Sequence, residues 1–303
     1  DHRDLHLSLR RQRQMCIRDS HSFAFKGYLE CNWLQAVEVG IDPAHASFLH
    51  RYLKNYEPEY GLQFGGKSGD SEIAMTTVLR DYSCPEINVE ETEFGMRLVT
   101  ARALNTENMH VRVTNLVFPN LIIIPMTNDM CISQWHVPID DGHSWWYAMF
   151  TAFDKEVDKS AMRDQRLELY TLPDYKPRAN SSNNYGYDPE QQRTETYTGM
   201  GLDINVHDQW AVESPGRIYD RTKEHLGTTD KGIITFRKLL IKAIKGIATG
   251  KVAPFTLKDN EAGDFRGPMA IDTTVPLGNW QEEWKINDKK RRDHSEWAKG
   301  VGI

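Results

Sequence analysis

Asp42, His45 and His50 form the stretch of this sequence with the clearest chemical meaning, D-x-x-H-x-x-x-x-H. Two neutral imidazoles and one carboxylate can hold a non-haem Fe(II) as a facial triad that leaves coordination positions open for dioxygen. Between the two histidines an ideal helix turns by about 140°, so both rings can face one metal only if the helix is interrupted. Pro43 gives a reason for irregular backbone there. On its own, a histidine pair at this spacing also arises by chance.

A second segment, far downstream, favours the metal interpretation. It runs from Asn205 to Gly216 as N-V-H-D-Q-W-A-V-E-S-P-G and is followed by Ile218–Gly227 and Asp230. Together with the first motif and N-W-L-Q at residues 32–35, it resembles the catalytic domain of Rieske-type ring-hydroxylating oxygenases. The resemblance is to the branch that contains phthalate and phenoxybenzoate dioxygenases and aryl-ether O-demethylases. It covers roughly residues 25–240 and rests on motifs in the same order and spacing.

This resemblance implies a role for each matching residue. His45 and His50 match the two histidine ligands of the mononuclear iron, and Asp208 matches its carboxylate ligand. Asp42 matches the carboxylate that links an iron-bound histidine to a cluster-bound histidine of the neighbouring subunit, and so serves as an electron-transfer bridge. A carboxylate in that place also suits a ligating histidine, whose second ring nitrogen usually donates to such a group. A simple helix N-cap is the alternative for Asp42.

Four further residues are weaker candidates for the same site. Asp203 and Glu213 compete with Asp208 for the place of the third ligand and rank behind it. Asn32 and Gln35 match positions from which an amide could support the ligands, although ordinary surface amides would look the same.

The cysteines do not follow the pattern of a Rieske [2Fe–2S] cluster, which needs two cysteines and two histidines. The family supplies them as C-x-H and a later C-x-x-H, whereas no such histidine follows Cys16, Cys31, Cys84 or Cys131. We therefore expect the cluster only in an N-terminal domain that this chain lacks, and we expect the chain alone to be inactive.

Residues 1–20 are expected to be non-native. The run R-R-Q-R-Q-M-C-I-R-D-S at residues 10–20 resembles the translation of a sequencing-library adaptor, and such segments are excluded from fold reasoning. A basic arm and an amphipathic targeting peptide are the alternatives. We expect a catalytic domain at residues 21–250, with a long polar excursion at 154–198, and a C-terminal extension at 251–303.

Composition narrows the class of protein. A chain of 303 residues with 39% hydrophobic residues is typical of a globular protein with a large core. Its net charge of −6 argues against a nucleic-acid partner. No apolar run approaches the length of a membrane span. Cysteines without paired spacing favour a reducing, bacterial cytoplasm. The basic run at residues 289–292 is interpreted as a solvated helix face.

The pattern of apolar residues predicts an α+β layout. A helical region at 28–54 precedes a series of short strands, and a capped amphipathic helix at 229–249 follows. A short helix is expected around residues 280–284. The strands are expected at residues 73–79, 94–99, 110–114, 120–125, 131–138 and 145–153.

The resemblance refines this layout to a helix-grip fold, in which a curved antiparallel sheet surrounds a long helix and encloses an apolar cavity. Aromatic residues of the later strands could line that cavity, although ordinary packing is the stronger expectation for each of them. His136 and His143 are interpreted as structural or solvent-facing histidines. The candidate lining residues are Trp135, His136, Trp145, Trp146, Tyr147, Phe150 and Phe153.

The implied activity is that of an oxygenase component. It would use Fe(II), dioxygen and electrons from a Rieske cluster to hydroxylate an aromatic compound or to O-demethylate an aryl ether. The resemblance also implies a ferredoxin- or flavin-type reductase as electron donor and a head-to-tail homotrimer when the protein is full length. The alternatives are a metal-free helix-grip module that binds a hydrophobic molecule, and a zinc hydrolase, which usually has an H-E-x-x-H motif that is missing here.

Overall fold

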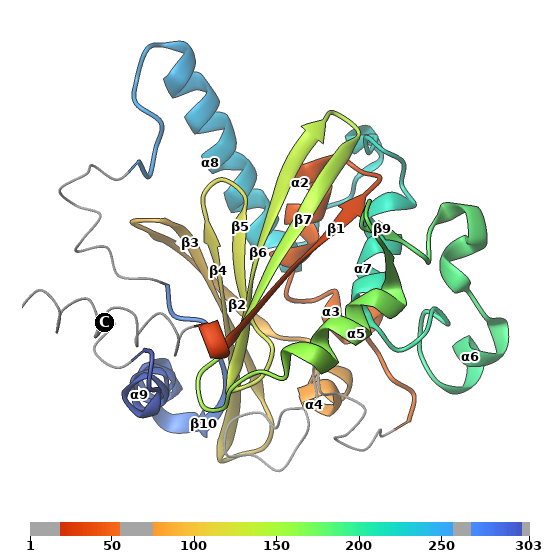
Figure 1. Cartoon of the computed structure of the whole chain (residues 1–303). Helices are drawn as coiled ribbons and strands as arrows, with labels where there is room; N and C mark the ends of the chain where they lie inside the picture. Colours follow the sequence, from red (N-terminus) through yellow and green to blue (C-terminus); the bar gives the residue numbers. More distant parts are fainter. Residues whose placement is uncertain (1–18, 55–74, 257–267, 299–303) are drawn as a thin grey trace, which may run out of the picture.

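A single large antiparallel sheet is the frame of the protein. The computed structural model describes residues 19–54, 75–256 and 268–298, and Figure 1 shows its elements. The strand order is β1-β7-β6-β5-β4-β3-β2, and β10 pairs with β4. The strands are β1 (Ser22–Leu29), β2 (Glu86–Thr92), β3 (Gly95–Ala103), β4 (Asn108–Val117), β5 (Leu121–Pro125), β6 (Met130–Asp140), β7 (His143–Ala152) and β10 (Ile271–Pro276), with β8 (Tyr170–Thr171) and β9 (Lys176–Pro177) forming a separate pair.

Alternating burial explains why the central segments are strands. In β7, Trp146, Ala148 and Phe150 are buried, whereas Tyr147 and Met149 between them are exposed. Side chains of a strand point to opposite faces in turn, so the buried set lies on one face of the sheet. That face carries the main core.

Helices cover both faces of the sheet unequally. Figure 1 shows α2, α3, α5 and α7 gathered on one side, while α9 lies on the other beside β10. The tryptophans of α9, Trp280 and Trp284, pack against apolar residues of β3, β4 and β10. The helices are α2 (Trp33–Gly40), α3 (Ala46–Leu49), α4 (Met75–Asp81), α5 (Lys159–Leu169), α6 (Pro189–Thr194), α7 (Ile204–Glu213), α8 (Lys231–Ala248) and α9 (Trp280–His294), with a 3₁₀ segment, η2 (Ser181–Gly186), before α6.

The long helix α8 is packed mainly through its first half. Ile233 and Phe236 join the core that α2 and strands β3 to β5 share. A Cβ on Gly232 would lie 2.7 Å from the carbonyl oxygen of Ile41, so glycine is what lets α8 approach the backbone immediately before Asp42. The second half of α8 extends away from the sheet in Figure 1.

The expected α+β class, a helix-grip fold with an antiparallel sheet and a long helix, is confirmed, and the sheet is open. Expected strands at 94–99, 110–114, 120–125, 131–138 and 145–153 correspond to β3 to β7. Within the described residues, no helix combines the length and the apolar composition that crossing a membrane requires.

Two structural expectations are wrong. The segment expected as a strand at 73–79 forms α4 from Met75, while Ile73 and Ala74 lie outside the described residues. In the basic run at 289–292, Arg291 is buried and pairs with Asp288. The polar stretch 154–198 contains α5, η2 and α6, and Asp158 caps α5 by accepting a hydrogen bond from the Ala161 N–H.

Strands β1, β2 and β10 lay outside the expected strands, and β1 overlaps the start of the expected helical region. Of the expected non-native segment 1–20, residues 1–18 lie outside the described residues.

A buried ion cluster joins β10 to the sheet. Asp272 on β10 is fully buried and accepts hydrogen bonds from His110 Nε2 at 3.1 Å and from Arg112 Nη1 at 2.8 Å. Both partners lie on β4, which pairs with β10. A buried carboxylate is tolerated only when such partners compensate its desolvation.

We predict that Asp272→Ala lowers the free energy of unfolding by about 3–5 kcal/mol, because it removes the fully buried carboxylate that His110 and the partly buried Arg112 pair with. Urea denaturation followed by circular dichroism measures this change. Asp293→Ala is the matched control, because it removes the carboxylate of an exposed pair with Lys289 and should cost no more than about 0.5 kcal/mol. Equal effects of the two substitutions would contradict a stabilising role for the cluster.

Candidate metal centre and adjoining cavity

The first motif lies where the helical region is interrupted. Helix α2 ends at Gly40, the chain turns through Asp42 and Pro43, and the short α3 begins after His45. His45 precedes the first residue of α3 and His50 follows its last. The ring centroids of the two histidines are 5.1 Å apart. The interruption predicted from the spacing therefore brings both rings to one point.

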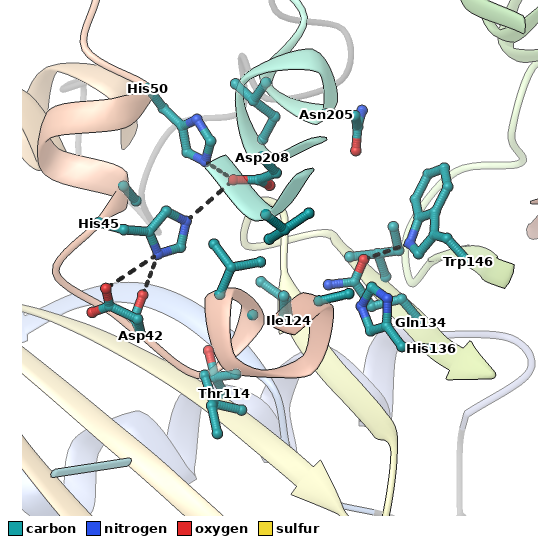
Figure 2. Close-up of a pocket in the computed structure, with 18 of the residues that line it drawn as sticks. Asp42, His45, His50, Thr114, Ile124, Gln134, His136, Trp146, Asn205 and Asp208 are labelled. Carbon is teal, nitrogen blue, oxygen red and sulfur yellow. Dashed lines mark hydrogen bonds and ion pairs between the residues drawn. The ribbon is translucent and has the colours of Figure 1, made fainter. Parts of the chain in front are cut away.

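Asp208 reaches the same point from α7. Its Oδ1 lies 3.5 Å from His45 Nε2 and 3.2 Å from His50 Nε2, as Figure 2 shows. The start of α7 is held by Asp203, whose side chain accepts from the Asn205 N–H and from Arg166 Nη2 at 2.9 Å. Arg166 on α5 is itself buried, so Asp203 serves as a helix cap and ion-pair partner.

The three groups form a possible set of metal ligands. One ligand atom from each of His45, His50 and Asp208 lies within 4.8 Å of the others, the only such group found among the described residues. Asp208 Oδ1 is buried and has no hydrogen bond of good geometry within the described part of the chain, although both imidazoles face it. A cation between the three groups would satisfy these atoms.

Backbone contacts set the tautomer of His45. Its Nδ1 forms a short hydrogen bond with the backbone carbonyl of Asp42, and a carbonyl can only accept, so Nδ1 carries the proton. In the neutral ring Nε2 is then the unprotonated nitrogen, and it faces Asp208. The carboxylate of Asp42 is 4.0 Å from Nδ1 at Oδ2, and its Oδ1 accepts from the Ala44 N–H at 2.8 Å. The carboxylate thus stabilises the turn, while the carbonyl orients the imidazole.

The local charges shift the pKa values of two of these groups. Burial alone would lower the pKa of His45, but the hydrogen bond and negative charge of Asp208, with Asp42, outweigh it and raise that pKa to about 8. Burial would raise the pKa of Asp208, but the nearby His50 and His45 hold it well below its usual range. The Asp208 carboxylate therefore favours protonated His45, and the two histidines favour ionised Asp208.

His207 is a supporting residue that sequence reasoning did not single out. Its ring stacks on His50 with centroids 5.7 Å apart, and its Nε2 donates to the Gly201 carbonyl at 3.0 Å. Burial lowers the pKa of His207 to about 4, so the ring is neutral and does not repel a cation. Its position beside Asp208 in the second motif was the available signal.

Glu213 lies away from the three ligand groups. It is buried, and accepts hydrogen bonds from the Glu30 N–H, the Tyr185 hydroxyl and Gln209 Nε2. Burial raises its pKa despite these donors. Glu213 and Asp203, the two competing candidates for the third ligand, therefore both have carboxylate oxygens that accept hydrogen bonds from local partners.

The two amides of the early helix act at a distance from the centre. Asn32 caps α2 by accepting from the Leu34 N–H, and donates to the Asp141 carbonyl. Gln35 donates from Nε2 to the carbonyls of Val212 and Gly216. Neither forms a hydrogen bond with His45, His50 or Asp208 among the described residues. Gln35 instead binds the end of α7, the helix that carries Asp208.

An apolar cavity of about 140 Å³ adjoins the three groups. Of the expected aromatic lining residues, His136, Trp146 and Phe150 contribute to it. Trp145 and Tyr147 alternate with Trp146 along β7, and Phe153 packs with Trp297 elsewhere. The other lining residues include Leu29, Ala36, Leu79, Thr114, Ile124, Met126, Ile132, Gln134, Tyr170 and Asn205.

Comparison with known proteins identifies the family. The family described as "LigXa C-terminal domain like" matches residues 15–289. The oxygenase subunit of phthalate 4,5-dioxygenase from Pseudomonas putida is 29% identical over 240 residues, which are 75% of this chain and 52% of that subunit. The oxygenase subunit of 3-chlorobenzoate-3,4-dioxygenase from Comamonas testosteroni is 25% identical over 266 residues, 80% of this chain and 58% of that one.

Among solved structures, NdmB of Pseudomonas putida CBB5 superposes with a TM-score of 0.43 at 15% identity, covering 76% of this chain and 52% of that chain. This chain spans about half the length of the relatives it matches. On the family match, the chain belongs to the LigXa C-terminal-domain-like family, which confirms its resemblance to the catalytic domain of a Rieske oxygenase.

Proposed function

We propose that His45, His50 and Asp208 hold a mononuclear Fe(II), and that the chain is the catalytic part of a Rieske-type oxygenase. Its substrate would be an aromatic compound that is hydroxylated or an aryl ether that is O-demethylated. The observation that carries the proposal is the convergence of the three ligand atoms within 4.8 Å at the wall of an apolar cavity.

The donor set fits this metal. Two imidazole nitrogens and one carboxylate oxygen are the ligands of non-haem Fe(II) sites that keep open positions. When bound, the iron would supply dioxygen activation, with electrons from a Rieske [2Fe–2S] cluster that a separate domain provides. No H-E-x-x-H motif accompanies the histidines, so the zinc-hydrolase alternative lacks the usual general base.

The residues of the chain would position the metal and exclude water. The Asp42 carbonyl holds His45 in the tautomer with Nε2 available, and neutral His207 supports the ring of His50. Apolar groups such as Ile124, Ile132 and Phe150 line the adjoining cavity, which favours an aromatic ring over water. The carboxylate of Asp42 is partly exposed and so could contact a cluster-bearing neighbour, in a homotrimer that receives electrons from a reductase.

Removal of one ligand should empty the site. We expect His50→Ala and Asp208→Ala to retain less than about a tenth of the iron of the unsubstituted chain after anaerobic loading with Fe(II), because outer partners alone already change affinity by about 10–100-fold. Metal analysis of the desalted protein measures this. The control is His143→Ala, because His143 pairs with Asp140 in a surface turn and should keep full occupancy. Stoichiometric iron in either ligand variant would overturn the assignment.

Iron affinity should rise with pH. A histidine ligand must bind as the neutral ring, and the pKa of His45 is about 8. Below that pH a proton must be displaced, so the dissociation constant for Fe(II) should fall by about tenfold per pH unit from 6 to 8 and level off above. Anaerobic titration at several pH values measures it. A dissociation constant that is flat between pH 6 and pH 8 would contradict the proton competition.

Asp42→Asn should separate metal binding from electron delivery. Iron occupancy should stay unchanged, because the carbonyl that orients His45 remains. When the variant is assembled with a Rieske domain and reductase, product formation should fall by about 10–100-fold. Product per electron consumed is the readout, and Asp42→Glu, which keeps the charge, is the control. Normal turnover by Asp42→Asn would remove the bridging role.

A further inference from the structure

His136 is a buried polar group whose ring has no hydrogen-bond partner among the described residues. Its side chain is on β6 with 5% of the residue exposed, and neither ring nitrogen forms a hydrogen bond among the described residues. The backbone of His136 is held on both sides by Asn120, which accepts from the N–H and donates to the carbonyl. These two bonds fix the backbone of His136 and leave its ring nitrogens available. An unsatisfied buried imidazole is costly unless a ligand completes it.

Gln134 lies two residues earlier on the same face and offers a second polar group. Its Oε1 accepts from Trp146 Nε1 at 2.7 Å, which fixes the amide so that its nitrogen is the donor left over. None of the hydrogen bonds among the described residues uses that nitrogen. Both side chains line the cavity next to the candidate metal centre. Figure 2 shows them on the opposite side of Ile124 from His45, His50 and Asp208.

The charges around His136 select against an anionic ligand group. Burial lowers the pKa of His136 to about 4, and Asp208 is the one charged residue that acts against this shift. Arg112, a cation that also lines the cavity, is paired with Asp272 and lies on β4, two strands away from β6. A carboxylate beside His136 would thus be buried without a cation, which is unfavourable.

An uncharged group that both donates and accepts a hydrogen bond would satisfy the two side chains together. A phenolic hydroxyl can donate to an unprotonated imidazole nitrogen, or accept from a protonated one, and still pair with the amide of Gln134. The cavity volume of about 140 Å³ is close to that of an engineered apolar cavity of about 150 Å³ that binds benzene. One aromatic ring therefore fits between this polar end and the candidate metal centre.

We propose that His136 and Gln134 form a substrate-recognition site that binds the hydroxyl of a phenolic ring and so orients that ring in the cavity. The inference rests on the proposed function, since it takes the bound ring to be the substrate of the iron site. His136 is a specificity-determining residue in this account and does not contact the metal ligands.

The test uses calorimetric titration of the metal-free 303-residue chain with phenol, and with toluene as a probe of nearly the same shape that lacks the hydroxyl. We expect His136→Leu to weaken phenol binding by about tenfold, the loss expected for one or two buried hydrogen bonds. Toluene affinity should change by less than about twofold, because its apolar contacts remain. The ratio of the two affinities separates the hydrogen bond from any change in cavity shape.

Ile132→Val is the matched control, because Ile132 lies on the same strand and lines the same cavity. It should change phenol and toluene binding by the same factor. His136→Asn, which keeps a donor and an acceptor, should recover part of the phenol affinity. An unchanged ratio of phenol to toluene affinity in His136→Leu would overturn the proposal, as would benzoate binding more tightly than phenol to the unsubstituted chain.

A second measurement keeps the proposal testable if His136→Leu does not fold. In the unsubstituted chain labelled with ¹⁵N-histidine, phenol should shift the ring-nitrogen resonances of His136 and toluene should not; the same response to both probes would overturn the proposal. Neither experiment needs iron. A chain that fails to bind Fe(II) but discriminates phenol through His136 would contradict the proposed function alone, and the reverse result would contradict the recognition site alone.

Discussion

The attachment of α7 to α2 is the contact on which the candidate centre depends. The two histidines come from the turn after α2 and the carboxylate comes from α7, so no single segment of the chain contains the set. Gln35 on α2 donates to the Val212 carbonyl in the last turn of α7 and to the Gly216 carbonyl just after it, and its own oxygen accepts from the Tyr219 N–H. At the other end, the pairing of Asp203 with buried Arg166 fixes where α7 begins. Together these contacts set the position of Asp208 relative to both imidazoles.

The sheet positions a second set of polar side chains, on the other side of the same cavity. Because side chains alternate along each strand, β6 and β7 direct His136, Gln134, Trp146 and Phe150 into one cavity while their neighbours face away. The candidate metal ligands therefore lie on the helical side of the cavity, and His136 and Gln134 lie on its sheet side (Figure 2). An aromatic ring bound between the two sets would have one edge at the candidate metal ligands and the other at His136 and Gln134. Its position in the cavity, and not its affinity alone, would then determine which carbon reacts.

Much of this arrangement is predictable from sequence, and the failures have physical causes. The strands β3 to β7 follow from alternation, and α8 from its apolar period and its terminal glycine. At the start of α4, Thr76, Thr77 and Val78 are β-branched and so favour a strand, although such propensities are weak and context-dependent. The sequence of β10, I-D-T-T-V-P, does not predict a strand, because it buries Asp272 through partners on β4 that the local pattern cannot reveal. For the centre, the two sequence motifs predict His45, His50 and Asp208. The sequence favours a structural role for His136, since only the folded sheet shows that its ring nitrogens have no hydrogen-bond partner among the described residues.

The most direct test of the account is the position of iron itself. Crystals of the chain loaded anaerobically with Fe(II) can be measured on both sides of the iron absorption edge, which locates the metal independently of the protein density. We predict one anomalous peak per chain, within bonding distance of His45 Nε2, His50 Nε2 and a carboxylate oxygen of Asp208. A peak that contacts other residues, or the lack of any peak in crystals whose protein retains these three side chains in place, would contradict it.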